Sequence, residues 1–229
     1  MIRIGNTLGL FGNAVAVLGN PIPIPPPVPK PDASGGTITT NGDLKIHTFT
    51  TIGTFEMFES GDVSVLILGT GGAGGSAYNS GTPSGCGGGG AAGEINEFNI
   101  FLEAGTYDVS VYKTWPDEGY TCSFYNQSAA GGGNGNNGRV NYGGDGGDNG
   151  SYSGYNVPAI DDNLSGGGGA GAGGNATGQG AGGGAGKNSV ITGSSVEYGH
   201  GGNGGIFSFH GVRGSDGPDG LVIIAYKYK

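Results

Sequence analysis

The stretch VSVLILGTGGAGG (63–75) runs from an apolar β-strand pattern directly into glycine-rich sequence, and it decides the fold. Its first six residues are nearly all apolar, as expected of a central strand covered on both faces. A second strand of this kind, LVIIA (221–225), directly follows the end of the glycine-rich sequence. We therefore expect these strands to pair, or to stack in one core, with the glycine tract leaving one end of a β scaffold and returning to it.

Further strands are predicted from period-two alternation and from β-branched or aromatic enrichment. They are LKIHTFTTIGTFEMF (44–58), INEFNIFL (95–102), YDVSVY (107–112) and SVITGSSVEY (189–198). Helix patterns are missing from the sequence. The expected fold is therefore mostly β, with a β-sandwich scaffold.

Glycine dominates the middle of the chain, with 57 glycines in 229 residues and 48 of them between residues 69 and 220. The runs have no fixed three-residue phase, which excludes collagen. They are 69–75, 85–93, 131–138, 143–150, 166–174, 178–186 and 199–205. One interpretation is flexible linkers. The other, which we favour because the runs alternate with apolar segments, is a packed bundle of polyproline II-type helices, each about 25 Å long at about 3.1 Å per residue.

The N-terminal region divides into an apolar peptide and a proline-rich spacer. Residues 21–31, PIPIPPPVPKP, contain seven of the eleven prolines, and this composition favours an extended rod. The peptide before them is too short for a core of its own. It is expected to be an extended anchor that inserts into a partner, although a poor signal peptide is the alternative. The anchoring residues are Ile2, Ile4, Leu8, Leu10, Phe11, Val15, Val17 and Leu18. The expected domains are the anchor (1–20), the spacer (21–33) and a glycine-rich β domain (34–229).

Composition and motifs exclude several function classes. The net charge of −9 gives no basic footprint for nucleic acid. The three histidines, His47, His200 and His210, are scattered, and no nucleophile elbow or zinc motif occurs. We expect no enzyme activity, catalytic residue, cofactor or metal. A calcium site through Asp145 and Asp148 in GGDGGD is the weaker alternative to a solvated loop.

Two further points of chemistry concern the cysteines and the loops. Cys86 and Cys122 are the only cysteines, and the sequence leaves open whether they form a bridge or remain free thiols. The segments between glycine runs carry aromatic residues beside Asp and Asn, which suits sugar stacking or a protein epitope. The alternative is that single aromatics cover the ends of the bundle. The candidate receptor-binding residues are Tyr78, Trp115, Tyr120, Tyr152, Tyr155, Phe207 and Phe209.

The order of these features resembles the glycine-rich domain of many bacteriophage tail and fibre proteins. The resemblance covers roughly residues 46–228 and rests on HTFTTIGTFEMF, VSVLILGTGGAGG, GCGGGGAAGEI, AGTYDVSVY and GSDGPDGLVIIAYKY. A similar layout occurs in the glycine-rich region of the anaplastic lymphoma kinase receptor family. The tail-fibre adhesins of T-even-like phages are similar in using packed polyglycine helices whose loops contact the host.

This resemblance implies a surface protein of a phage particle. Its expected function is attachment to a host-surface glycan or protein, as a tail-fibre or head-fibre adhesin held to other virion proteins through residues 1–31. The main alternative is a capsid decoration or minor structural protein without receptor binding. The fibre analogy, together with the apolar N-terminal peptide, also leads us to expect a homotrimer.

Overall fold

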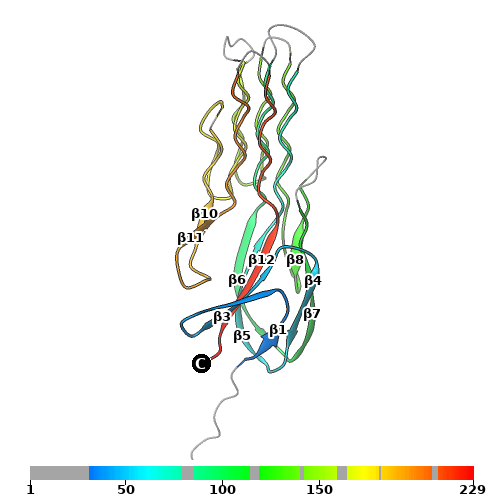
Figure 1. Ribbon diagram of the computed structural model, residues 1–229, viewed down its shortest axis with the longest axis vertical. Helices are drawn as coiled ribbons and strands as arrows, with labels where there is room; N and C mark the ends of the chain where they lie inside the picture. The colour runs from blue at the N-terminus through cyan, green and yellow to red at the C-terminus, as the bar shows by residue number, and fades with distance from the viewer. Residues whose placement is uncertain are drawn as a thin grey trace, which may run out of the picture.

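The protein folds into antiparallel β-sheets from which a long glycine-rich region projects (Figure 1). The computed structural model describes residues 31–78, 85–113, 119–139, 142–158, 164–180, 182–207 and 211–229. Twelve strands and no helix occur in these ranges. The prediction of a mostly β fold is confirmed.

The first five-stranded sheet has the order β2-β3-β12-β5-β6, with every pair antiparallel. Its strands are β2 (Thr37–Asn41), β3 (Leu44–Phe49), β12 (Leu221–Lys227), β5 (Gly61–Leu68) and β6 (Ile95–Leu102). The predicted pairing of the two most apolar strands is confirmed, since Leu68 of β5 lies opposite Leu221 of β12. Both strands are central and both are buried, which explains their nearly continuous apolar sequence.

The second five-stranded sheet has the order β1-β4-β7-β8-β9. Its strands are β1 (Ala33–Ser34), β4 (Gly53–Met57), β7 (Gly105–Ser110), β8 (Cys122–Phe124) and β9 (Gln127–Ala129). The strand pattern over 44–58 is not one strand, because the chain bends at residues 50–52 and crosses from the first sheet to the second. The crossing keeps Phe49 and Phe55 in the same core, so the alternating pattern continues through the bend.

The two sheets pack face to face around one apolar cluster. This cluster takes Val65 and Ile224 from the first sheet and Phe55, Val109 and Phe124 from the second, and all five side chains are fully buried. Burying such side chains is the main favourable term in folding, at about 1.5–3 kcal/mol for each large apolar group. The clustered aromatic rings of Phe55 and Phe124 meet edge to face at 5.9 Å between centroids.

A short hairpin covers part of the outer face of the first sheet. It consists of β10 (Lys187–Ser189) and β11 (Val196–Tyr198), so the strand pattern over 189–198 forms a turn and a returning strand. Gly193 in this turn has a φ of 82°, a conformation that favours glycine. Ile191 packs against the outward side chains of the sheet, in the cluster formed with Ile46, Leu66, Leu68, Ile223 and Ala225.

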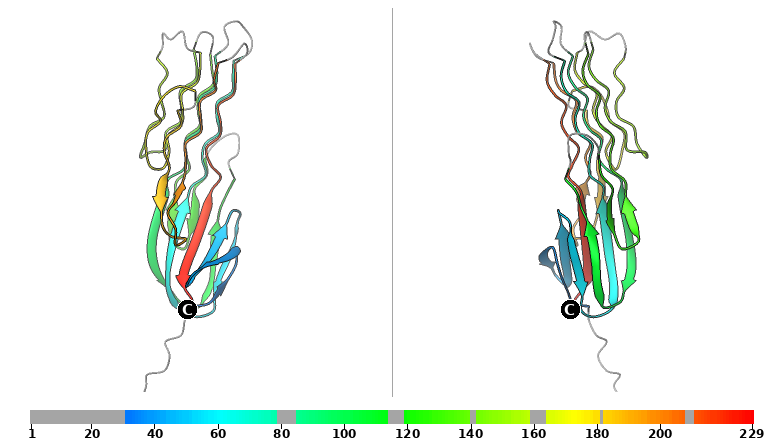
Figure 2. Two further views of the ribbon diagram at one scale, coloured as in Figure 1. Left: turned by 60° about the vertical axis from the view of Figure 1, so that its left-hand side comes forward. Right: turned by 90° about the vertical axis from the view of Figure 1, so that its right-hand side faces the viewer.

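The glycine-rich segments extend from one end of the two-sheet scaffold and lie side by side (Figures 1 and 2). We call them the glycine-rich array. They comprise 69–78, 85–94, 130–139, 142–149, 152–158, 164–174, 176–180, 182–186, 199–207 and 211–220. The array begins where β5 ends at Leu68 and returns where β12 begins at Leu221, as the sequence predicts. The carboxyl terminus, Lys229, lies at the opposite end of the scaffold (Figure 1).

Candidate functional site

The centre of the glycine-rich array is the segment 85–94, whose backbone bonds to six neighbouring segments. Those neighbours are 69–76, 130–139, 142–149, 164–174, 199–207 and 211–220. The direction of the bonds repeats every third residue. Thus Cys86, Gly89 and Ala92 donate their N–H groups to Leu164, Gly167 and Ala170 at 2.8 Å each. The next residues in each triplet, Gly87 and Gly90, donate to a different neighbour, Val212 and Ser215.

Close backbone contact explains why most of these positions are glycine. A Cβ atom added at Gly88 would lie 1.8 Å from the carbonyl oxygen of Asp145, and one at Gly166 would lie 1.9 Å from that of Gly87. Neither distance is compatible with a side chain. By contrast, a Cβ at Gly178 would meet nothing within 4 Å.

One segment of the array, residues 211–220, is not among the seven glycine runs of the sequence. Its glycines are single and stand at every third position, Gly211, Gly214, Gly217 and Gly220. Two of them donate N–H groups to the first segment of the array, Gly214 to Gly75 at 3.0 Å and Gly217 to Gly72 at 2.9 Å. The signal that identifies this segment is the period of three rather than the density of glycine.

Asn and Asp side chains complete the hydrogen bonding of the array by accepting backbone N–H groups. Asn134 Oδ1 accepts from Ala73 at 2.7 Å, and Asp216 Oδ1 accepts from Gly74 at 2.8 Å. The same role is played by Asn137, Asn175 and Asn203 toward Ser76, Ser153 and Gly183. In each case a side chain takes the place of a carbonyl group from a further segment.

Asp145 and Asp148 belong to this capping set. Their Oδ1 atoms accept from the backbone N–H groups of Val157 and Gly154, each at 2.7 Å. Within the described ranges, no group of three or more His, Cys, Asp or Glu side chains is placed to hold a metal ion. The carboxylates of the half-buried Asp145 and the exposed Asp148 thus bind backbone N–H groups.

Two of the candidate receptor-binding residues, Tyr78 and Phe207, end segments 69–78 and 199–207, which run away from β5 and β11 toward the far end of the array (Figure 1). Tyr78 donates its N–H to Gly85 at 3.0 Å, and Phe207, 41% exposed, donates its N–H to Ser165 Oγ at 3.0 Å. The neighbouring apolar side chains Ile206 and Val212 are also exposed, at 61% and 45%. We call these four residues the distal surface.

The remaining candidates do not join the distal surface. Tyr120 lies beside Tyr112 at the base of the array, with ring centroids 5.6 Å apart, and accepts a hydrogen bond from the N–H of Thr70. Tyr152 and Tyr155 lie on the segment that follows Asn149 and are half-buried. Trp115 and Phe209 lie outside the described residues, as do all eight predicted anchoring residues.

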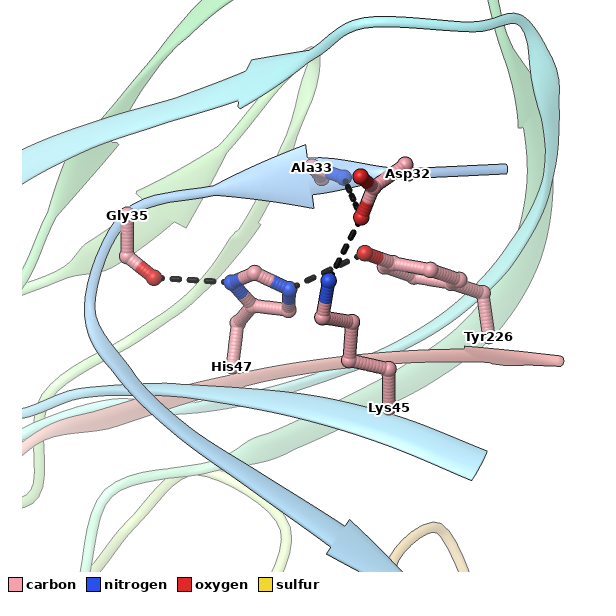
Figure 3. Close-up of polar contacts among 6 residues, drawn as sticks. All are labelled: Asp32, Ala33, Gly35, Lys45, His47 and Tyr226. Carbon is pink, nitrogen blue, oxygen red and sulfur yellow. Dashed lines mark hydrogen bonds and ion pairs between the residues drawn. The ribbon is translucent and has the colours of Figure 1, made fainter. Parts of the chain in front are cut away.

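Where the described chain begins, polar contacts of the buried His47 and Tyr226 and of the exposed Asp32 fix it to the scaffold (Figure 3). His47 Nδ1 donates to the carbonyl oxygen of Gly35 at 2.8 Å, and its Nε2 accepts from the Tyr226 hydroxyl at 3.2 Å. Burial disfavours the charged imidazolium and lowers the pKa of His47. Lys45 forms an ion pair with Asp32, and this bond lowers the pKa of the carboxyl group.

The other groups with potential reactivity are isolated in the described part of the chain. Cys86 and Cys122 are free thiols and both are buried, which raises the pKa of each. His200 is exposed and lies 3.3 Å from Glu197. Among the described residues there is no helix that is long and apolar enough to cross a membrane.

No protein-family model matches the chain, and no curated protein is significantly similar to it.

Proposed function

We propose that this chain is a surface protein of a bacteriophage particle, held at its scaffold end and presenting the distal surface to the host. The observation that carries the proposal is the polarity of the molecule. The carboxyl terminus lies at one end, and the glycine-rich array extends to the other (Figure 2). Ile206 and Phe207, which end segment 199–207, and Val212, near the start of segment 211–220, are exposed. A rigid projection with a fixed root and a free end suits attachment over a distance.

We further propose that the segments of the glycine-rich array are polyproline II-type helices. Such a helix has three residues per turn, so its N–H groups point in three directions that repeat every third residue. The hydrogen bonds of segment 85–94 follow this repeat, and its six neighbours are the number expected of parallel rods in a hexagonal arrangement. Contacts of Cα–H groups with carbonyl oxygens in such close packing add about 0.5–1 kcal/mol each.

This architecture supports an attachment role because the array is held together largely by its backbone. The Cβ distances at Gly88 and Gly166 require glycine in the interior, while Phe207 and Ile206 at the far end are exposed. Side chains at the free end are thus available for binding, because the packing of the array does not require them. Residues 1–31 would provide the contact with other virion proteins, and their apolar side chains support the proposal of a homotrimer.

The location of the protein on the particle is the first test. A gold-binding tag fused after Lys229 lies at the scaffold end and leaves the distal surface unobstructed. Electron microscopy of tagged particles should show label at the tail or on head fibres. Label spread evenly over the capsid, together with normal adsorption of separate particles that lack the protein, would instead establish a decoration protein.

The binding surface is tested by matched substitutions of exposed phenylalanines. Phe207→Ala removes the aromatic side chain of the distal surface, whereas Phe101→Ala removes one that is 55% exposed on β6 of the scaffold. We expect Phe207→Ala to slow adsorption to host cells by about tenfold, the loss typical of one aromatic contact at an interface. Phe101→Ala should leave the rate unchanged in particles shown by blotting to carry equal amounts of protein. Equal adsorption by both variants would contradict the proposed distal surface.

A further inference from the structure

A second surface feature, a polar cavity, lies where the glycine-rich array meets the scaffold. Its volume is about 510 Å³, within the range of small-ligand pockets. Four parts of the chain form its walls: the beginning of β6, the turn at residues 149–152, residues 172–173 of the glycine-rich array, and the beginning of β10. The side chains that matter for its chemistry are Glu94, Asn149, Tyr152, Lys187 and Asn188.

The turn that carries Tyr152 is held in place by a buried amide. Asn149 is 4% exposed, and its Nδ2 donates to the carbonyl oxygen of Gly171 at 2.9 Å. Its Oδ1 accepts from the N–H groups of Tyr152 and Ser151 at 2.8 and 3.2 Å. Both polar atoms of the Asn149 side chain, Oδ1 and Nδ2, are thus hydrogen-bonded within the wall of the cavity. The backbone position of Tyr152 is therefore fixed before any ligand binds.

Other polar groups of the cavity have bonding capacity left. Glu94 Oε1 accepts from Ser151 Oγ at 3.4 Å, while its Oε2 has no hydrogen-bond partner among the described residues. Lys187 and Asn188 are exposed, and neither side chain is hydrogen-bonded or ion-paired within the described ranges. The cavity therefore offers a carboxylate acceptor, an ammonium donor and an amide that does both, beside one aromatic residue.

We propose that this cavity binds a short neutral oligosaccharide. Sugar hydroxyls both donate and accept, so they match a mixed set of donors and acceptors, and the C–H face of a pyranose packs on an aromatic ring. The opposite charges of Glu94 and Lys187 cancel, which removes the preference for a charged ligand. A lipid or another apolar ligand is disfavoured by the polar walls.

Sugar binding in this cavity does not depend on where the protein lies on a phage particle. The cavity is separate from the distal surface, since none of Tyr78, Ile206, Phe207 and Val212 lines it. Sugar binding is measured on the isolated full chain, whereas the proposed function is measured by labelling and adsorption. Either result can fail while the other holds.

The test is a titration of the ¹⁵N-labelled full chain with chitotriose, maltotriose and cellotriose, each up to about 10 mM, which exceeds a millimolar dissociation constant. We expect at least one of them to shift the amide signals of Gly173, Lys187 and Asn188 in a saturable way. Tyr152→Ala should weaken binding of that sugar about tenfold, because the packing surface for the sugar ring is lost. Asn188→Trp, which fills the cavity from its exposed rim, should abolish binding.

Tyr155→Ala is the matched control, since Tyr155 is equally half-buried on the same segment but does not line the cavity. It should bind the sugar as the unaltered protein does. The proposal is overturned if none of the three sugars shifts these signals, or if Tyr152→Ala and Tyr155→Ala bind equally well. It is also overturned if the shifts centre on the distal surface and persist in Asn188→Trp. The ¹⁵N spectrum of each variant reports directly whether it is folded.

Discussion

The substitution Gly88→Ala tests whether backbone contact, rather than glycine flexibility, determines the composition of the array. Gly88 is in the central segment, and its own N–H donates to Asn136 at 2.9 Å. The added methyl group would lie 1.8 Å from the carbonyl oxygen of Asp145 and 2.4 Å from its carbonyl carbon. Since ordinary contacts of carbon are about 3.5–4.0 Å, the neighbouring segment must move by well over an ångström.

The size of the effect follows from what that movement disrupts. The displaced segment is bonded to the central one through Gly144 to Cys86 and Gly147 to Gly89, at 2.8 and 2.9 Å. Each such bond contributes about 0.5–1.5 kcal/mol net, and overpacking adds about 1–3 kcal/mol. We therefore expect the free energy of unfolding to fall by about 2–6 kcal/mol, and the Tm by about 4–24 °C for a chain of this size.

The matched control is Gly178→Ala in the same glycine-rich array. No atom lies within 4 Å of the added Cβ, and the φ of Gly178 is outside the left-handed region. Alanine should then be neutral or stabilise by about 0.4–1 kcal/mol, because it restricts the unfolded chain. Urea unfolding followed by circular dichroism measures both variants. If Gly88→Ala were tolerated as well as Gly178→Ala, the close-packing argument would be refuted.

Three further outcomes are expected. Asn134→Ala should lower the free energy of unfolding by about 1–3 kcal/mol, because the N–H group that Asn134 accepts belongs to the buried Ala73. Asn137→Ala should lower it by less than about 0.5 kcal/mol, because the N–H group of Ser76 is left exposed to water. Urea unfolding measures both. Burial lowers the pKa of His47 from 6.5, so below that pH the unfolded chain binds a proton that the folded protein does not, and the Tm should fall as the pH is lowered. His47→Gln should flatten this pH dependence in calorimetric scans between about pH 7.5 and 5.5. Cys86 and Cys122 should react with a thiol reagent at pH 8 only after denaturation, because both are buried and the pKa of each is raised.

The scaffold was largely predictable because its signals are local. The apolar strands β5 and β12 are identified by composition alone, and their adjacency follows from the glycine tract that leaves and returns between them. The short strands β1, β2, β8 and β9 were not predicted. β1, β8 and β9 have only two or three residues each, too few to show a periodicity, and β1 pairs with a partner distant in sequence, since Ala33 lies opposite Met57. All five residues of β2 are exposed, so this strand has no buried face that its sequence could show.

The candidate site was less predictable, because its geometry depends on the register between segments. Aromatic content selected Tyr152 and Tyr155 equally, yet only Tyr152 lines the cavity at the root of the array. The capping role of Asn134 was also hidden, because its acceptor oxygen serves an N–H that lies 61 residues away in the sequence. Asn and Asp within glycine runs are the signal that could have been used, since a chain with few side chains needs acceptors where a neighbouring segment is missing.

Positions packed by backbone contact and positions exposed to solvent alternate in the array, and this supports the proposed attachment function. At Gly205 an added Cβ would lie 2.1 Å from the carbonyl oxygen of Val212, whereas the next residue, Ile206, is 61% exposed. One residue is fixed by backbone contact and its neighbour is free. In a core made of interlocking side chains, a change at a binding residue alters the packing of others, and stability limits what can be exchanged. Here the backbone carries the packing, so exposed positions at the free end can change chemistry while the array beneath them stays the same.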